Sequence, residues 1–295
     1  MSFFLLFDII NMVIKMKKIV GIFVLIIFII ILVLLYSRYI GTKGLSVKEY
    51  KISYSNLSDD FYGLKIVHLS DVHYKTLINK KELEKIVDKI NSTKPDIVIL
   101  SGDLFNSSNK LSNDEIDEIT ECLKNINASI GKFAIKGDND IIDNWNTIIS
   151  NSNFKDLNNT YELIYTNKTN YIFLAGISSN ISDSNIDNKL KDIYEFLNDE
   201  NNKPNYSILV MHEPDFIDQI DYDKFNLVLA GHSLNGLIKL PIIGGILKQD
   251  KAKKYYSEHY KLNNTEFYIS SGLGVDKYRF RLFNKPSFNL YRITN

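Results

Sequence analysis

Short runs of β-branched and other apolar residues that each end in aspartate or histidine constrain the fold of this chain most strongly. Five such runs are "KIVHLSDVH", "DIVILSGDLF", "FAIKGDND", "SILVMHEPD" and "LVLAGHS". Segments with helical periodicity lie among them, for example 80–91, where apolar residues recur every three or four positions. Strand and helix patterns that alternate in this way predict an α/β fold.

The same patterns predict individual elements. The predicted strands are 64–69, 97–100, 132–135, 171–175, 207–211, 227–230, 267–270 and 288–293. The predicted helices are 80–91, 113–125, 188–197 and 214–220.

Polar residues capable of metal ligation follow five of the predicted strands. Taken singly, an aspartate after a strand is often a helix cap or an Asx-turn, and a histidine beside apolar residues is often a satisfied core residue. Ligands in open α/β sheets bind at the carboxyl ends of strands, and glycine precedes three of these residues, which allows close backbone approach. Together they predict a ligand site formed by Asp71 and His73, Asp103, Asp138 to Asp140, His212 and His232.

Carboxylate and imidazole groups together suit Mn²⁺, Fe, Zn²⁺ or Ni²⁺ better than Ca²⁺, which prefers oxygen ligands alone. The predicted ligands are too many for one ion and suit two ions that share a carboxylate. Two ions roughly 3.5–4 Å apart activate water and bind the oxygens of an in-line displacement at phosphorus. The sequence therefore predicts two divalent metal ions as cofactors.

The order and spacing of these residues resemble the calcineurin-like metallophosphoesterases, whose motifs are D-x-H, G-D, G-N-H-(D/E), H and G-H-x-H. The phrases "GHSLNGLIKLP", "ISSGLG" and "FRLFNKPSF" resemble a membrane-anchored bacterial branch that includes phosphoesterases similar to UDP-2,3-diacylglucosamine pyrophosphatase. The resemblance extends from about Leu45 to the C-terminus. It implies a four-layer sandwich of two mixed β-sheets flanked by helices.

The resemblance also implies which residues bind each metal. The first metal would take Asp71, His73, the shared Asp103 and the second histidine of G-H-x-H. The second would take Asp103, Asp138, His212 and His232. Asp140, which matches the acidic residue closing G-N-H-(D/E), would orient a neighbouring ligand rather than bind metal.

Three positions depart from the family pattern. Asp138 replaces the usual asparagine and adds a negative charge to the second site. Asn139 replaces the histidine that aids catalysis; an amide can hydrogen-bond but cannot transfer a proton at neutral pH. Leu234 replaces the last imidazole of the first site, which should weaken metal binding there, unless His68 or His259 fills the vacancy.

An uncharged stretch at 19–36, "IVGIFVLIIFIIILVLLY", is nearly long enough to span a bilayer core of about 30 Å. Because no A-x-A-like cleavage site follows it, we expect an uncleaved single-pass anchor rather than a signal peptide. The predicted organisation is an N-terminal flank (1–18), the transmembrane anchor (19–36), a polar tether (37–50) and the phosphoesterase domain (51–295). Lysines on both sides leave the orientation weakly determined, and the relatives favour an extracytoplasmic domain in the cell membrane.

Two functions follow. One is a membrane-anchored, metal-dependent phosphoesterase that hydrolyses a phosphodiester or pyrophosphate of a small molecule or a lipid-linked head group, with Asp103 and Asn139 in catalytic roles. The other is a non-catalytic, membrane-tethered binding module that retains one metal. The 35 basic and 35 acidic residues balance, which argues against a nucleic-acid partner, and no protein partner is indicated.

A cluster of four lysines leaves two readings open. They could line a phosphate entrance, or they could lie at a solvated helix end. The residues are Lys248, Lys251, Lys253 and Lys254.

Overall fold

The computed structural model describes residues 2–106, 110–140, 142–165, 169–179, 185–240 and 243–295. The α-helices are α1 (Ser2–Tyr39), α2 (Lys80–Ser92), α3 (Asn113–Lys124), α4 (Ile142–Asn151) and α5 (Ile186–Asn198). The strands are β1 (Ser46–Ser53), β2 (Lys65–Leu69), β3 (Ile97–Leu100), β4 (Gly131–Ala134), β5 (Lys155–Asp156), β6 (Thr160–Tyr165), β7 (Tyr171–Gly176), β8 (Tyr206–Val210), β9 (Leu227–Ala230), β10 (Lys239–Leu240), β11 (Gly244–Gly245), β12 (His259–Leu262), β13 (Thr265–Ile269) and β14 (Ser287–Thr294). Short 3₁₀-helices are η1 (Asp59–Phe61), η2 (Pro214–Gln219), η3 (Tyr222–Lys224) and η4 (Leu234–Gly236).

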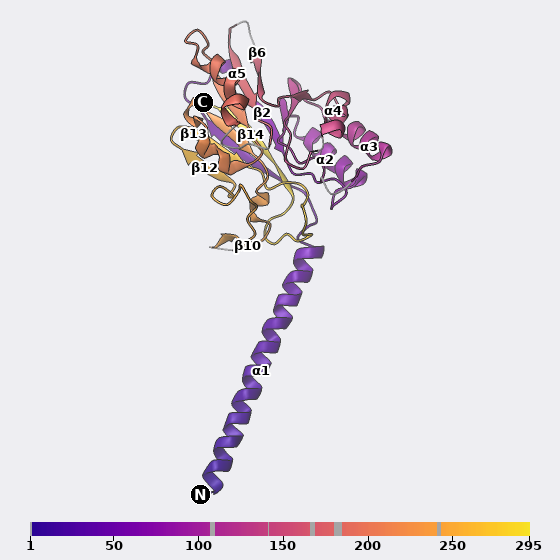
Figure 1. Cartoon of the computed structure of the whole chain (residues 1–295), viewed down its shortest axis with the longest axis vertical. Coiled ribbons are helices and arrows are strands. Elements are labelled where there is room, and N and C mark those ends of the chain that lie inside the picture. Colours follow the sequence, from indigo (N-terminus) through magenta and orange to yellow (C-terminus); the bar gives the residue numbers. More distant parts are fainter. Residues whose placement is uncertain (1, 107–109, 141, 166–168, 180–184, 241–242) are drawn as a thin grey trace.

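The strands form two six-stranded sheets and a small hairpin of β10 and β11 (Figure 1). The first sheet has the order β1-β14-β2-β3-β4-β5, and β14 runs antiparallel to β2 while β2, β3, β4 and β5 are parallel. The second has the order β12-β13-β9-β8-β7-β6, with antiparallel pairs at both edges and parallel strands between them. Both sheets are therefore mixed.

Helices cover the outer faces of the two facing sheets. Ile66 and Ile99 of the first sheet pack with Ile208 of the second in a core between the sheets. Val67 and Val98 are adjacent in sequence to Ile66 and Ile99, and they pack instead with α2, α3 and α4, because successive strand side chains point to opposite faces of a sheet. A third core joins the outer face of the second sheet to α5. This confirms the α/β architecture of two mixed sheets with helices outside.

All eight predicted strands are present, with ends within one or two residues of those expected. Six further strands of the described residues were not predicted: β1, β5, β6 and β12, which lie at the edges of the two six-stranded sheets, and β10 and β11, which form the small hairpin. Edge strands are partly solvated, so their sequences, such as "SVKEYKIS" and "HYKL", lack the apolar runs of central strands. Because β1 begins at Ser46, residues 46–50 belong to the first sheet and not to the tether expected at 37–50.

Two helical predictions need correction. The segment expected as a helix at 214–220 forms the 3₁₀-helix η2, in which the Ile220 N–H donates to the carbonyl of Ile217. Helix α4, "IDNWNTIISN", was not predicted because it is rich in asparagine and β-branched residues, which have low helix propensity. Burial of Trp145 and Ile148 against α3 stabilises it.

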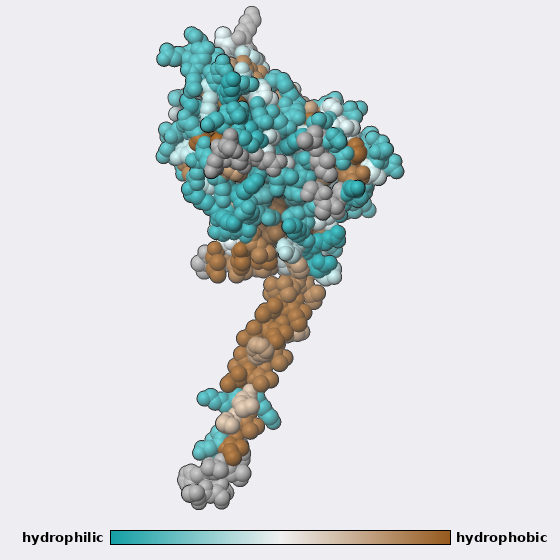
Figure 2. Space-filling view, viewed as in Figure 1, coloured by the Kyte–Doolittle hydropathy of each residue, from teal (hydrophilic) through white to brown (hydrophobic). Residues whose placement is uncertain are grey.

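Helix α1 projects away from the two sheets as a single rod (Figure 1). The most apolar 18-residue window of its Phe7–Tyr39 segment has a mean hydropathy of 3.5 and is 0% buried, and Figure 2 shows the apolar surface of this helix. A helix this long and apolar can cross a membrane, and an N-terminal signal sequence meets the same criteria.

Candidate metal centre

The carboxyl ends of five strands bring the predicted ligands together from both sheets. Asp71 and His73 follow β2, Asp103 follows β3 and Asp138 follows β4. From the second sheet, His212 follows β8 and His232 follows β9. The ligand atoms form two clusters that could each hold a metal ion, with all atoms of a cluster within 4.8 Å of one another: Asp71, His73 and Asp103; and Asp103, Asp138, His212 and His232.

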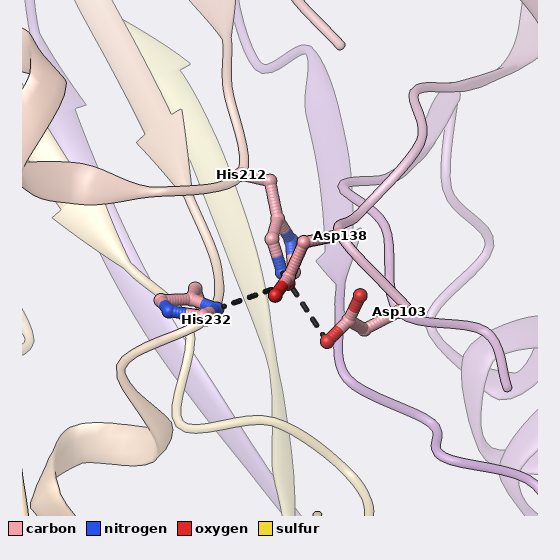
Figure 3. A group of neighbouring side chains, drawn as sticks. All are labelled: Asp103, Asp138, His212 and His232. Carbon is pink, nitrogen blue, oxygen red and sulfur yellow. Dashed lines mark ion pairs between the residues drawn. The ribbon is translucent and has the colours of Figure 1, made fainter. Parts of the chain in front are cut away.

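In the second cluster, Asp138 lies between two imidazoles (Figure 3). Its Oδ1 is 3.4 Å from His212 Nε2 and 3.4 Å from His232 Nδ1. Asp103 Oδ2 is also 3.4 Å from His212 Nε2. Two carboxylates and two imidazoles thus converge on one point, which is a ligand set suited to a transition-metal ion.

Backbone carbonyls orient both imidazoles of this cluster. The Nδ1 of His212 lies 2.6 Å from the Ser101 carbonyl oxygen, so Nδ1–H donates and Nε2 keeps its lone pair toward the carboxylates. The Nε2 of His232 lies 2.7 Å from the Asp250 carbonyl oxygen, so Nδ1 is the free ligand atom. Metal-binding histidines characteristically have their other nitrogen held in this way.

The first cluster lies beside the second and shares Asp103. His73 Nε2 is 3.8 Å from Asp71 Oδ1 and 3.7 Å from Asp103 Oδ2. Asp71 Oδ1, His73 Nδ1 and His212 Nε2 are among the described buried polar atoms that have no hydrogen-bond partner. A buried oxygen or nitrogen without a partner is costly, and a cation would satisfy those that face the cluster, so the residues fit a metal pair.

The backbone at this centre is strained. Asp71, His73, Asp103 and His232 have positive φ angles of 51°, 45°, 54° and 63°. Non-glycine residues in this region cost of order 1–3 kcal/mol each, and such residues cluster at functional sites. Position 137, directly before Asp138, must be glycine, because a Cβ there would lie 2.1 Å from Asp103 Oδ1.

The carboxylates and imidazoles perturb one another. Burial lowers the pKa of His212, but the Asp103 and Asp138 carboxylates outweigh it and raise that pKa well above its usual value. Burial raises the pKa of Asp138, yet the neighbouring His212 and His232 imidazoles bring it well below its usual range. The electrostatic potential at the centre is therefore strongly negative, which favours the binding of protons or metal ions.

Asp140 and Asn139 both hydrogen-bond to Asp103, the carboxylate that the two clusters share. The Asp140 carboxylate accepts the N–H groups of Asp103 at 2.9 Å, Leu104 at 2.9 Å and Gly137 at 2.7 Å. Burial and the nearby Asp103 carboxylate raise the pKa of Asp140 to about 8. Asn139 donates its backbone N–H to Asp103 Oδ1 at 3.0 Å and its side-chain amide to Oδ2 at 2.8 Å.

Leucine occupies the place of the missing imidazole, and neither candidate histidine replaces it. Leu234 is fully buried in a small apolar cluster with Leu237 and Val275. His68 is buried with Nε2 2.7 Å from Ser101 Oγ and Nδ1 3.4 Å from Tyr291 Oη. His259 lies on the exposed edge strand β12, 2.6 Å from Glu266. Neither joins a cluster of potential ligands within the part of the chain that the structure describes.

A cleft of about 320 Å³ opens over both clusters, and some of its lining residues were not predicted. Asn106 donates to Asp276 at 2.8 Å across the cleft, a pairing 170 residues apart in sequence that has no local signal. Of the four clustered lysines, Lys251 alone lines the cleft, and its Nζ is 3.0 Å from the fully buried Glu213.

The remaining lysines lie outside the cleft lining. Lys253 and Lys254 pair with Asp250 and Asp218, and Lys248 lies over the Tyr256 ring. Of these four lysines, only Lys251 is therefore placed at the cleft, which Lys277 also lines, and no helix ends within residues 248–254.

A sequence profile of the calcineurin-like phosphoesterases matches residues 64–236, more than half of the chain. The chain therefore belongs to the calcineurin-like phosphoesterase family. Among curated proteins, it is 28% identical over 264 residues to the uncharacterized metallophosphoesterase YkuE of Bacillus subtilis, with 88% of each chain covered.

Two further relatives are longer than this chain. The uncharacterized metallophosphoesterase Cj0846 of Campylobacter jejuni is 27% identical, with 79% of this chain and 59% of that protein covered. A zebrafish (Danio rerio) "transmembrane protein with metallophosphoesterase domain" is 24% identical, with 77% and 52% covered. Among solved structures, GAP50, the anchor in the inner membrane complex of Plasmodium, aligns with a TM-score of 0.49 at 13% identity over 79% of this chain and 82% of that chain.

Proposed function

We propose that this protein is a membrane-anchored, metal-dependent phosphoesterase that hydrolyses a phosphodiester or pyrophosphate bond. The observation that carries the proposal is that two clusters of potential ligands share one buried carboxylate, Asp103. Through this shared carboxylate, the two clusters would hold two neighbouring cations, which suits in-line displacement at phosphorus.

Each cluster supplies ligands of the type that a divalent Mn, Fe, Zn or Ni ion prefers. Asp71, His73 and Asp103 would hold the first ion, and Asp103, Asp138, His212 and His232 would hold the second. When bound, the ions supply an activated water and offset charge on the phosphoryl oxygens. Asp140 accepts the backbone N–H groups of Asp103 and Gly137 and so holds together the two loops that carry Asp103 and Asp138.

The residues around the pair favour a substrate with an acidic leaving group. Asn139 replaces the family's histidine, is bound to Asp103, and cannot protonate a leaving group at neutral pH. General acid catalysis contributes roughly 10²–10⁴-fold, and a pyrophosphate or activated diester needs less of it. Lys251, held by buried Glu213 at the cleft, is placed to attract the phosphoryl charge.

We further propose that α1 is a single-pass anchor and that the phosphoesterase domain, expected at 51–295 and extended to Ser46 by β1, lies outside the cytoplasm. The flank 1–18 and a tether shortened to the residues between α1 and β1 complete the organisation. A lipid-linked head group, as in the branch resembling UDP-2,3-diacylglucosamine pyrophosphatase, would be within reach of an enzyme held at a bilayer. The balanced charge of the chain favours such a substrate over nucleic acid.

One observation favours the alternative, a non-catalytic membrane-tethered module that retains one metal. Leu234 stands where the family has its last imidazole, and its apolar side chain is fully buried, which leaves three potential protein ligands at the first site. The second cluster has four ligands and is complete by itself. In that case the protein binds one ion and a phosphorylated ligand without turnover.

Hydrolysis of bis-p-nitrophenyl phosphate by the full chain in detergent with Mn²⁺ separates the two functions. The matched control is Asp103→Asn, which keeps the side-chain shape and removes the shared charge. Turnover in the parent that disappears in the variant and with chelator supports the enzyme. A folded parent that binds Mn²⁺ without turnover supports the binding module.

A further inference from the structure

Large apolar side chains gather on the outer surface of the sheet-bearing part of the protein, close to where α1 ends. Residues 40–295 are called the head here, and this surface is called the apolar rim. Its members are exposed to extents of 41–70%: Ile40, Ile243, Ile246, Leu247 and Phe283. Figure 2 shows an apolar band at the base of the head beside the end of α1.

Backbone hydrogen bonds join the rim into one continuous surface. The Arg281 N–H donates to the carbonyl of Ser37 in the last turns of α1 at 3.1 Å. The Lys239 N–H at the start of β10 donates to Leu282 at 2.9 Å, and the Ile246 N–H after β11 donates to Ile238 at 2.8 Å. The hairpin therefore lies beside the end of the helix, as Figure 1 shows for β10.

Phe283 is held outward by the fold. Its φ angle of 51° lies in the left-handed region, which is unfavourable for an aromatic residue. Its neighbours Leu282 and Asn284 are buried, whereas Phe283 is 65% exposed. Asn284 donates to the carbonyl of Leu234 at 2.6 Å, which ties this turn to the loop that carries His232.

The segments that form the rim are basic although the whole chain is neutral, and the acidic groups near them come from elsewhere in the chain: Glu258 pairs with Lys48 and Lys239, and Glu82 lines a pocket with Arg38. The described segments that form the rim, 36–48, 237–240, 243–249 and 277–286, contain no aspartate or glutamate. These segments also carry exposed cations: Arg38, Lys43, Lys248, Arg279 and Lys285. Tyr39 and Tyr278 are exposed beside them. Basic and aromatic residues around an apolar surface are typical of contact with the interface of an anionic bilayer.

We propose that the apolar rim inserts into the head-group region of an anionic bilayer, so that the head lies on the membrane rather than swinging from α1. The proposal rests on the membrane anchoring proposed above. A symmetric contact with a second copy would bring the cations of both rims together, whereas anionic lipid neutralises them. Because η4 and β10 directly follow His232, docking fixes the candidate metal centre relative to the bilayer.

Site-directed fluorescence tests the proposal in the full chain, whose single native cysteine, Cys122, is buried. Phe283→Cys and Ile243→Cys are labelled with an environment-sensitive dye and reconstituted into vesicles of phosphatidylcholine, alone or mixed equally with phosphatidylglycerol. Lipids spin-labelled near the head group serve as quenchers for the rim, and lipids spin-labelled near the end of the acyl chain serve as quenchers for position 25. Tyr165→Cys, at the end of β6 and also exposed, is the matched control on the head, and Leu25→Cys reports on α1.

We expect a blue shift and strong quenching at positions 283 and 243, more so with phosphatidylglycerol, and neither effect at position 165. The proposal is overturned if the dyes at positions 283 and 243 are quenched no more than the dye at position 165. A blue shift without quenching by lipid also overturns it, because that result indicates contact between protein surfaces. Quenching at position 25 without quenching at positions 283 and 243 rejects docking of the apolar rim and leaves membrane anchoring by α1 supported. Absence of quenching at position 25 rejects the anchor instead, and quenching at the rim is then the measure of docking by itself.

Discussion

Asn139 donates two hydrogen bonds to the Asp103 carboxylate, one from its backbone N–H to Oδ1 at 3.0 Å and one from its side-chain amide to Oδ2 at 2.8 Å. Asp103 is the carboxylate that both ligand clusters share. The residue that replaces the family's histidine is therefore engaged in holding a ligand. It orients the carboxylate through which two cations would be joined.

Asn139→Ala should weaken metal binding without unfolding the protein. It removes the side-chain hydrogen bond to Asp103 Oδ2 and leaves the backbone one, and loss of such an outer contact typically lowers metal affinity about 10–100-fold. Calorimetric titration of the metal-free full chain with Mn²⁺ measures the change. Asn146→Ala on α4, which is exposed, is the matched control, and equal affinities in the two variants would contradict the role given to Asn139.

Leu234→His should make stability depend on metal at the first site. Without metal, an imidazole in the apolar cluster of Leu237 and Val275 should cost about 1–3 kcal/mol of unfolding free energy. With Mn²⁺ the added ligand should recover that loss and raise the rate of diester hydrolysis.

Leu234→Asn separates coordination by an imidazole from simple polarity at this position, because a neutral amide oxygen is a weaker ligand for these ions than an imidazole nitrogen. Thermal unfolding of both variants with chelator and with Mn²⁺ gives the comparison. The interpretation of position 234 as a vacated ligand position fails if Mn²⁺ stabilises the two variants equally.

The buried His68 should make the protein less stable in acid. Burial lowers its pKa to about 3, against about 6.5 in an unfolded chain. Below pH 6.5 the unfolded chain takes up a proton that the folded protein does not, so this contribution to stability falls as the pH decreases toward 3.

For one such group, stability should fall by about 2 kcal/mol between roughly pH 7 and pH 5. His68→Gln lacks this term, and comparing the two proteins cancels the contributions of the other titrating groups. Urea unfolding of both in detergent with chelator measures the difference. Parallel stability curves over this range would show that His68 titrates normally.

Arg281 should be a major determinant of stability. Its buried guanidinium donates to the carbonyls of Ser271 at 2.9 Å, Gly272 at 3.1 Å and Asn284 at 3.3 Å, and it also contacts Gly274. Arg281→Lys supplies a compact ammonium that cannot reach all of these acceptors, so we expect a loss of about 2–4 kcal/mol. The exposed Arg279→Lys should change stability by less than about 0.5 kcal/mol in the same unfolding experiment. A similar small effect at position 281 would refute this role.

Central parts of the fold were predictable because burial on both faces leaves continuous apolar runs such as Ile97–Leu100. Edge strands β1 and β12 were not, since solvent on one side permits charged residues. Helix α4 was missed because tertiary packing of Trp145, and not helix propensity, stabilises it.

The candidate ligands were predictable because each stands directly after a strand, at a place that the strand pattern defines. The partners that orient them were not. The carbonyl of Asp250 that holds His232, and the Asn106–Asp276 pair across the cleft, depend on contacts between distant segments. The sequence also gave no sign that Asn139 would bind Asp103.

The number of Mn²⁺ ions bound per chain tests the central claim most directly, that two sites share Asp103. Metal-free full chain in detergent is titrated with Mn²⁺ and analysed for bound metal, beside Asp103→Asn and the exposed control Asp143→Asn. We predict one tight and one weaker ion in the parent and in Asp143→Asn, and a loss of affinity at both sites in Asp103→Asn. A folded parent that binds no Mn²⁺, or an Asp103→Asn variant that binds it as the parent does, would contradict the account.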